Sequence, residues 1–362
     1  MNTEQKSIFS TLDYPLLTGI LLVCSLGLIT LYSASGEDVD LLINHSGRIV
    51  IAMIAMYIVS LIPISTLSTM SLHLYLVGIV FLILVLVFGI VGKGAQRWVD
   101  LGVINFQPSE IMKITVPMMA AWIMTHNPMM PSVMKIFLAV LSIVIPCVLV
   151  ILQPDLGTAL LIAASGSIVI FLAGISWKII LVFGVVGAVS APLVWTMVLY
   201  DYQKERILTM LDPWSDPLGA GYHAVQSMIA IGSGGVIGKG WLAGTQSRLE
   251  FIPERSTDFI FSVMGEEFGL GGFILLMLIY LMLVFRGFWI GFCVEDTYAK
   301  LLAGGLSFTF FAYVFVNIGM VSGILPVVGV PLPFISYGGT SIVTLMIGFG
   351  ILMSISQKMK TN

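Results

Sequence analysis

The chain has 362 residues, of which 58% are hydrophobic and only 10% are charged, and its mean hydropathy is +1.05. These values exclude an ordinary soluble domain. The net charge of −3 carries little information about partners because most of the surface would face lipid, and no nucleic-acid partner is expected. The charged residues are spaced so that apolar runs of about 20 residues, the length of a membrane-spanning helix, lie between them.

The apolar runs do not alternate polar and apolar residues, and backbone groups in lipid must be hydrogen-bonded internally. The sequence therefore predicts an all-α polytopic membrane protein, with residues 1–362 forming a single membrane domain. Its first apolar run is too long for a signal-peptide core and is expected to be a retained anchor. Ten spans are predicted, at residues 14–34, 46–64, 70–91, 108–126, 135–152, 156–174, 177–199, 265–286, 298–322 and 336–357. A large extracytoplasmic loop, residues 200–264, separates the seventh span from the eighth.

The orientation follows from the basic residues in short loops and at span ends. With both termini in the cytoplasm, the outer loops receive only Arg48, Lys93 and Arg97. The cytoplasmic side then receives Lys6, Lys135, Lys178, Arg286, Lys300, Lys358 and Lys360. The same orientation places residues 200–264 outside.

Two predicted span ends on the outer side carry ionisable residues. Glu110 and Lys113 are three residues apart, so they share one helix face and can pair. An ionisable pair inside a span by default indicates a function, but a structural ion pair that joins two helices explains it equally well. Asp155 follows Pro154 and precedes an apolar run, so it either caps a helix or belongs to a site.

The outer loop holds 12 of the chain's 35 charged residues, among them Lys239, Arg248, Arg255 and Asp258. Loops this long in compact proteins are usually functional. Within it, residues 222–231 are predicted to form a helix on the membrane surface. The glycine-rich stretch 232–240 lacks the Walker spacing, so nucleotide binding is not expected.

Residues 323–333 contain three prolines and two glycines, which interrupt an otherwise chargeless run. Irregular backbone at membrane depth is tolerated where it is buried in protein or lines a wet cavity. We therefore expect a cavity on the same side as the outer loop, with Ser336 among the substrate-binding residues.

Several of these stretches carry a family resemblance that covers almost the whole chain. They are Gln107–Glu110, Gln153–Thr158, Gly244–Phe251, Pro253–Phe259, Asn317–Met320 and Pro331–Gly339. In these motifs the sequence resembles the SEDS proteins (shape, elongation, division and sporulation). One position departs from the family pattern, because Ser256 stands where the family often has histidine before Thr-Asp. Any role of that histidine cannot be carried over.

The resemblance implies a peptidoglycan glycosyltransferase of the bacterial inner membrane, with ten spans and an active site that faces the periplasm. Its substrate would be lipid II, polymerised into glycan strands for elongation and rod shape. Its partners would be a class B penicillin-binding protein transpeptidase and other membrane proteins of the elongation complex. The resemblance implies that Asp258 is the key acid, and that the charged set of the cavity consists of Arg97, Glu110, Lys113 and Asp155.

The residue types suit this chemistry. A sugar hydroxyl that displaces undecaprenyl diphosphate needs a general base, and Asp258 can supply it; the alternative is that Asp258 only caps a helix over 259–264. The charge of the leaving group must be neutralised, for which Lys113, Arg97, Lys239, Arg248 and Arg255 are the candidate cations. A divalent cation, Mg²⁺ or Mn²⁺, could do the same, although no residue spacing predicts a metal site. An α-linked donor that gives a β-linked glycan requires inversion in one displacement.

Two other functions fit the same features. Buried charges and broken helices would also suit a transporter that flips lipid II, although no internal repeat is visible. A non-enzymatic scaffold for wall-synthesis proteins is the third possibility. Polymerisation by the pure protein distinguishes the enzyme from both.

Overall fold

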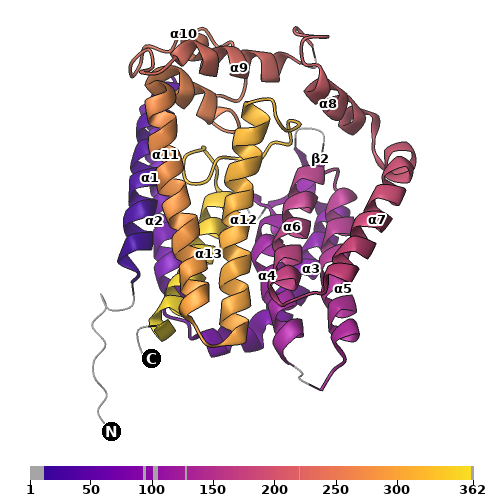
Figure 1. The fold of residues 1–362 in the computed structure, drawn as a ribbon. Helices are drawn as coiled ribbons and strands as arrows, with labels where there is room; N and C mark the ends of the chain where they lie inside the picture. The colour runs from indigo at the N-terminus through magenta and orange to yellow at the C-terminus, as the bar shows by residue number, and fades with distance from the viewer. Residues whose placement is uncertain (1–11, 93–94, 101–104, 127–128, 220, 360–362) are drawn as a thin grey trace, which may run out of the picture.

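The chain forms a bundle of long helices that is covered at one end by three shorter ones (Figure 1). The computed structural model describes residues 12–92, 95–100, 105–126, 129–219 and 221–359. In this part of the chain, the bundle helices are α1 (Tyr14–Ala34), α2 (Val39–Ser60), α3 (Ile64–Phe88), α4 (Pro108–His126), α5 (Ser132–Ile151), α6 (Leu156–Leu172), α7 (Trp177–Leu193, continued by the π-helix Val194–Val198), α11 (Ile260–Cys293), α12 (Thr297–Val321) and α13 (Thr340–Met359). The covering helices are α8 (Asp201–Leu211), α9 (Tyr222–Gly234) and α10 (Thr245–Arg248).

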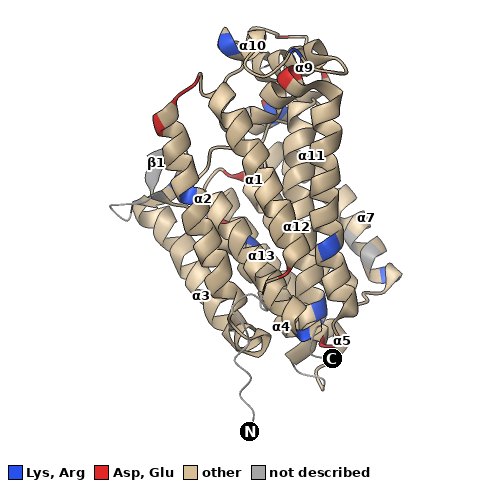
Figure 2. Ribbon diagram, turned by 90° about the vertical axis from the view of Figure 1, so that its left-hand side faces the viewer, with Lys and Arg blue, Asp and Glu red and all other residues tan. Residues whose placement is uncertain are grey.

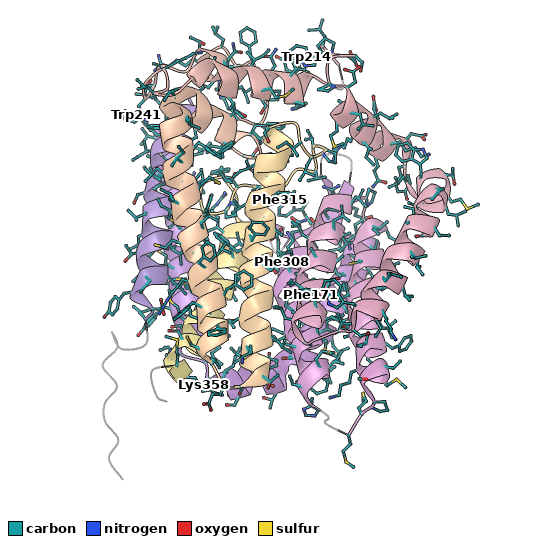
Figure 3. The ribbon with its side chains drawn as sticks, in the orientation of Figure 1. Phe171, Trp214, Trp241, Phe308, Phe315 and Lys358 are labelled. Atoms are coloured by element: carbon teal, nitrogen blue, oxygen red, sulfur yellow. The ribbon has the colours of Figure 1, made fainter. Side chains whose placement is uncertain are left out.

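The composition of the bundle helices is that of membrane-spanning segments. Eight of them are long and apolar enough to cross a membrane, α6 is a shorter apolar helix, and α4 carries the charged residues Glu110 and Lys113. Most of the ribbon that is coloured for charged residues lies toward the two ends of the bundle, and a few charged positions lie between them (Figure 2). Between the two ends of the bundle, large apolar side chains such as Phe315 of α12 point outward (Figure 3). The protein is an all-α polytopic membrane protein, as the sequence predicts.

The predicted helix bounds are correct for some spans and wrong for others. The first span is confirmed as Tyr14–Ala34. The second begins at Val39, earlier than predicted, because the carboxylate of Asp38 caps it by accepting the Leu41 N–H at 3.0 Å. The predicted bounds of the second span, 46–64, are therefore wrong at both ends. Helix α11 also extends past both predicted ends, with a local break at Gly269, whose φ is +61°.

A small antiparallel sheet stands between α3 and α4, where the sequence predicts no strand. Strands β1 (Ile90–Gly92), β2 (Ala95–Asp100) and β3 (Asn105–Phe106) pair in the order β1-β2-β3. They were missed because strands this short give almost no alternating pattern. Lys93 lies outside the described residues. The sheet matters for the site because β2 carries Arg97.

The covering layer is attached to the bundle by buried hydroxyl groups. Helix α9 confirms the surface helix predicted over 222–231. The Ser227 hydroxyl of α9 is fully buried, donates to the Val321 carbonyl of α12 at 2.5 Å and lies 2.8 Å from the Ser262 hydroxyl of α11. In contrast, none of the residues of α7 whose burial is described is buried, and the helix slants away from the other helices (Figure 1). The firmly packed part of the covering layer therefore lies over α11 and α12.

Candidate active site

Asp258 is a half-buried residue two positions before α11, at the covered end of the bundle. Its backbone carbonyl accepts a hydrogen bond from the Asn317 amide of α12 at 2.9 Å, and the same amide donates to the Val330 carbonyl at 2.7 Å. Asn317 is completely buried. It thus joins the segment that carries Asp258 to the proline-rich stretch 323–333.

Ser336 and Tyr337, which precede α13, also bond to the segment that carries Asp258. The buried Ser336 hydroxyl donates to the Thr257 carbonyl at 2.6 Å and accepts the Leu332 N–H at 2.8 Å, while the Tyr337 N–H donates to the Ser256 carbonyl at 2.8 Å. Ser336 therefore positions backbone in this structure. Its predicted contact with substrate remains a prediction.

The carboxylate of Asp258 lies close to the proline-rich stretch 323–333. The N-cap residue of α11 is Phe259, and the helix has no side-chain capping hydrogen bond. A Cβ added at Gly329 would lie 3.3 Å from Asp258 Oδ2. Gly329 also has a φ of +72°, which a residue with a Cβ adopts only with strain. That Asp258 is the key acid, and not merely a helix cap, remains a prediction.

The predicted pair of Glu110 and Lys113 is present in α4 and is almost inaccessible to solvent. Lys113 Nζ lies 2.7 Å from Glu110 Oε1. Tyr313 of α12, which the sequence did not single out, donates its hydroxyl to Glu110 Oε2 at 2.8 Å and also contacts the Lys113 ammonium group. The exposed fractions of Glu110, Lys113 and Tyr313 are 4%, 3% and 1%. A low dielectric strengthens these contacts and makes a missing partner costly.

Arg97 and Asp155 form a second charged pair, between β2 and the start of α6. Arg97 Nε lies 3.6 Å from Asp155 Oδ2, and the guanidinium group also donates to the carbonyls of Gln153 and Pro154. Asp155 caps α6 through the Thr158 N–H at 3.2 Å. Asp155 therefore caps α6 and also pairs with Arg97, while its membership of a substrate site remains a prediction.

Each of the other three predicted cations is paired with a carboxylate. Lys239 Nζ lies 2.7 Å from Oε1 of the buried Glu266. The exposed Arg248 pairs with Glu37 at 3.0 Å, and Arg255 pairs with Glu250 at 3.1 Å. The substrate-binding roles of these three residues remain predictions.

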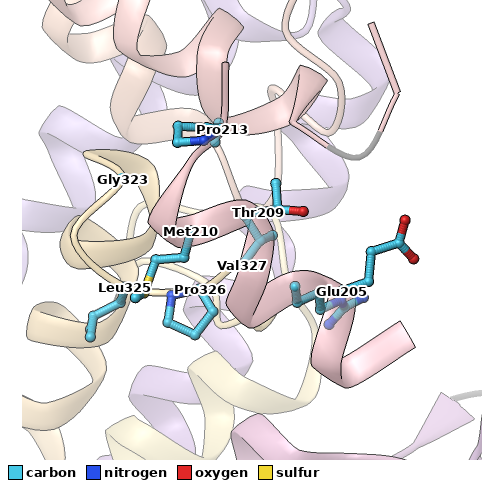
Figure 4. Close-up of a pocket in the computed structure, with 10 residues that line it drawn as sticks. Glu205, Thr209, Met210, Pro213, Gly323, Leu325, Pro326 and Val327 are labelled. Carbon is cyan, nitrogen blue, oxygen red and sulfur yellow. The ribbon is translucent and has the colours of Figure 1, made fainter. Parts of the chain in front are cut away.

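Two cavities lie beneath α8, beside the proline-rich stretch. The first is lined by the Arg97–Asp155 pair together with Gly157, Gln203, Arg206, Pro326 and Val328. The second, of about 280 Å³, is lined by Glu205, Arg206, Thr209, Met210, Pro213, Ala224, Gly323, Leu325, Pro326 and Val327 (Figure 4). Of the residues expected to line a cavity on the side of the outer loop, Arg97 and Asp155 line the first of these two, whereas Glu110, Lys113, Asp258 and Ser336 line neither. Arg206 lines both cavities and was not among the predicted site residues.

Comparison with known proteins gives a family match over nearly the whole chain. The model of the FtsW/RodA/SpoVE family, described as "Cell cycle protein", matches residues 5–361. The "Peptidoglycan glycosyltransferase MrdB" of Escherichia coli (strain K12) is 49% identical over 356 residues, which are 98% of this chain and 96% of that protein. The "Stage V sporulation protein E" of Bacillus subtilis (strain 168) is 33% identical over 349 residues, covering 93% of this chain and 94% of that protein.

Solved structures agree with this match. A chain from "Structural coordination of polymerization and crosslinking by a peptidoglycan synthase complex" superimposes with a TM-score of 0.84 and 30% identity, covering 97% of this chain and 99% of that chain. The Thermus thermophilus rod shape determining protein RodA gives a TM-score of 0.73 and 27% identity, covering 95% and 96% of the two chains. The resemblance to the SEDS proteins is confirmed, and the chain belongs to the FtsW/RodA/SpoVE family of multi-pass membrane proteins.

Proposed function

We propose that this protein is a peptidoglycan glycosyltransferase that polymerises lipid II into glycan strands for cell elongation and rod shape. The observation that carries the proposal is the carboxylate of Asp258. It lies beside Gly329 of the proline-rich stretch, and its backbone is held by Asn317 at the covered end of the bundle. The name of the E. coli relative supports the reaction class.

In the proposed reaction, Asp258 accepts the proton of the attacking sugar hydroxyl. The hydroxyl oxygen forms a bond with the anomeric carbon of the donor, and the bond from that carbon to the diphosphate oxygen breaks. Undecaprenyl diphosphate leaves with the bonding electrons. Because attack and departure occur on opposite faces of the sugar, one displacement converts an α-linked donor into a β-linked product.

The negative charge of the leaving diphosphate is the second requirement of the reaction. Arg97 and the buried Lys113 supply fixed positive charge, each oriented by a neighbouring carboxylate. A divalent cation that is bound mainly by the diphosphate oxygens would add to it, since Mg²⁺ commonly binds through one or two carboxylates plus substrate phosphates. In the described part of the chain, no three histidine, cysteine or acidic residues cluster as a ready-made metal site.

The partner we propose is a class B penicillin-binding protein transpeptidase, together with other membrane proteins of the elongation complex. The support is the structural neighbour, whose description joins polymerization and crosslinking in one peptidoglycan synthase complex. We propose that the protein lies in the bacterial inner membrane.

Polymerisation of lipid II by the purified protein tests the proposal. We expect glycan strands from the wild-type protein in detergent or liposomes, detected by gel electrophoresis of labelled product. If the protein instead moves lipid II across a liposome membrane without forming glycan, the transporter is the correct alternative. If neither activity is found while a penicillin-binding partner still co-purifies, the scaffold is favoured.

The proposed orientation, with both termini in the cytoplasm and the active site in the periplasm, can be tested by labelling. Ile237, in the covering layer, is 88% exposed, whereas Met129, at the other end of the bundle, is 93% exposed. In a cysteine-free background, we expect a membrane-impermeant maleimide to label Ile237→Cys in intact spheroplasts. Met129→Cys should react only after permeabilisation. The opposite pattern would invert the topology.

A further inference from the structure

Arg48 of α2 differs from the five cations discussed above, because no ion pair joins it to a carboxylate within the described part of the chain. It is half-buried, and its guanidinium carbon lies 4.5 Å from the centre of the Tyr337 ring, which holds it through a cation–π contact. Arg48 directly precedes the apolar run 49–59 of a helix that can cross a membrane. An ionisable residue at this depth by default indicates a function.

His45 is a second side chain of the same helix face that lacks a partner. It lies three residues before Arg48, so the two share one face of α2, and its ring lies 5.6 Å from the Tyr337 ring. It is completely buried, and neither of its ring nitrogens has a hydrogen-bond partner among the described residues. Buried polar groups are normally hydrogen-bonded. An unpartnered histidine beside an unpaired cation therefore indicates that a ligand, or water that the ligand orders, completes this site.

Helix α13 begins at the level of Arg48. The two helices α2 and α13 run side by side in the same direction, since Tyr337 contacts Arg48 and, further along, a Cβ built at Gly350 would lie 2.5 Å from the Met56 carbonyl oxygen. Both helices rise by about 1.5 Å per residue. The first residue of α13, Thr340, therefore lies as far before Gly350 as the region of Arg48 lies before Met56.

The first turn of α13 presents groups that bind anions. The first N–H groups of a helix have no acceptor within the helix, and the helix dipole favours negative charge there. This helix has 20 residues and no acidic residue in its first turn. A Cβ built at Gly339 would meet no heavy atom within 4 Å, so the space beside the turn is open, and one built at Gly338 would lie 2.8 Å from the Ser341 hydroxyl oxygen. Backbone N–H groups, a hydroxyl and a guanidinium group together suit a phosphate.

The same place is connected to the proposed general base and is distinct from the position of Lys113. The Tyr337 N–H donates at 2.8 Å to the carbonyl of Ser256, two residues before Asp258. Lys113 reaches α13 from α4, where it lines a small cavity together with Thr344. Arg48 and Lys113 thus approach the beginning of α13 from two different helices. When two lipid II molecules are joined, both carry a polyprenyl diphosphate, and only the diphosphate of the donor leaves. The reaction therefore needs two places for a diphosphate.

We propose that Arg48 and the first turn of α13 bind the diphosphate of the acceptor, the polyprenyl-linked sugar whose hydroxyl group attacks. This inference rests on the proposed function and deepens it, because it gives the acceptor a site separate from that of the leaving diphosphate. The acceptor diphosphate keeps all its bonds during the reaction, so Arg48 binds and orients it while Asp258 takes the proton. At the edge of the apolar run, Arg48 holds the diphosphate where the hydrocarbon chain of the acceptor can remain in lipid.

The kinetic test compares Arg48→Ala with Arg48→Lys and with the control Lys204→Ala. Lys204 belongs to the covering layer and pairs with the exposed Asp201 at 3.4 Å. We expect Arg48→Ala to raise the KM for lipid II about tenfold or more, the loss that follows from one hydrogen-bonded charge contact, with kcat changed much less. Arg48→Lys keeps the charge but not the two parallel N–H groups, so its KM should lie between those of the wild-type protein and the alanine variant. Lys204→Ala should match the wild-type protein. An unchanged KM in both Arg48 variants would overturn the assignment.

Native mass spectrometry separates this inference from the proposed reaction. Lipid II is added to Asp258→Asn and to the double variant Asp258→Asn/Arg48→Ala, so that turnover is suppressed. We expect two bound lipid II molecules in the first variant and one in the second at the same concentration. That loss supports the site even if the wild-type protein makes no glycan, in which case only the proposed reaction fails.

Two other results of this experiment would refute the proposal. Equal binding of lipid II by both variants, together with glycan synthesis by the wild-type protein, would leave the reaction standing and remove Arg48 from the acceptor site. Loss of a bound membrane phospholipid, identified by its mass, in place of lipid II would show that Arg48 holds a lipid headgroup and not the acceptor.

Discussion

Replacing Asp258 with asparagine is expected to lower glycan polymerisation by the purified protein by on the order of 100-fold or more, the usual scale for removing a general base. Asparagine keeps the shape of the side chain but cannot accept the proton of the sugar hydroxyl. The substitution leaves the surrounding structure in place, because Asn317 bonds to the backbone carbonyl of residue 258 and the N-cap of α11 is Phe259. The measurement is the initial rate of glycan synthesis from labelled lipid II.

The control for this variant is Asp201→Asn, which removes one carboxylate from the covering layer at a fully exposed position. It should polymerise lipid II at the wild-type rate. Both variants should elute as folded protein in size-exclusion chromatography and retain a penicillin-binding partner if the wild-type protein binds one. Near-normal synthesis by Asp258→Asn would move the role of base to another carboxylate, with Glu110 and Asp155 as the next candidates.

Replacing Lys113 with alanine is expected to abolish activity and to lower the yield of folded protein. The substitution leaves the Glu110 carboxylate with only Tyr313 as a partner in an environment that is almost dry. Breaking a buried ion pair in this way costs about 3–5 kcal/mol. The loss of stability should appear as a lower midpoint of thermal unfolding in detergent, measured beside the rate of glycan synthesis.

A double variant separates the two roles of this ion pair. Lys113→Met with Glu110→Gln removes both charges at similar volume, and such neutral replacements of buried pairs are often well tolerated. If Lys113 only joins helices, the double variant should regain both stability and activity. If Lys113 neutralises substrate charge, the double variant should regain stability alone. Full activity of Lys113→Ala at wild-type yield would remove Lys113 from the site.

The sequence predicted contacts between residues that are close to each other along the chain. The pair of Glu110 and Lys113 follows from a spacing of three residues on a helix, and the helix cap by Asp155 follows from its place after Pro154. The spans followed from hydropathy, because a membrane demands long apolar helices. Hydropathy did not give the start of α2, because residues 39–45 are polar in composition and the helix begins there through the cap that Asp38 provides.

Contacts between distant parts of the chain could not be predicted in this way. Tyr313 reaches Glu110 across 203 residues, and Arg248 reaches Glu37 across 211 residues. Without knowledge of how α4 faces α12, Tyr313 is one aromatic residue among many in apolar helices. The polar character of Asn317 within an apolar run was the one local signal that a buried amide would need partners.

The Ser227 hydroxyl, which contacts both Ser262 and Val321 from α9, has a consequence for local unfolding. If α9 lifts from the bundle, these buried partners lose their contacts at the same time, and unsatisfied buried polar groups are costly. Ser262 is one helical turn beyond Asp258 along the chain. We therefore expect helix α9 and the first turn of α11 to open as one cooperative unit. Their amide protons should exchange with solvent together rather than helix by helix.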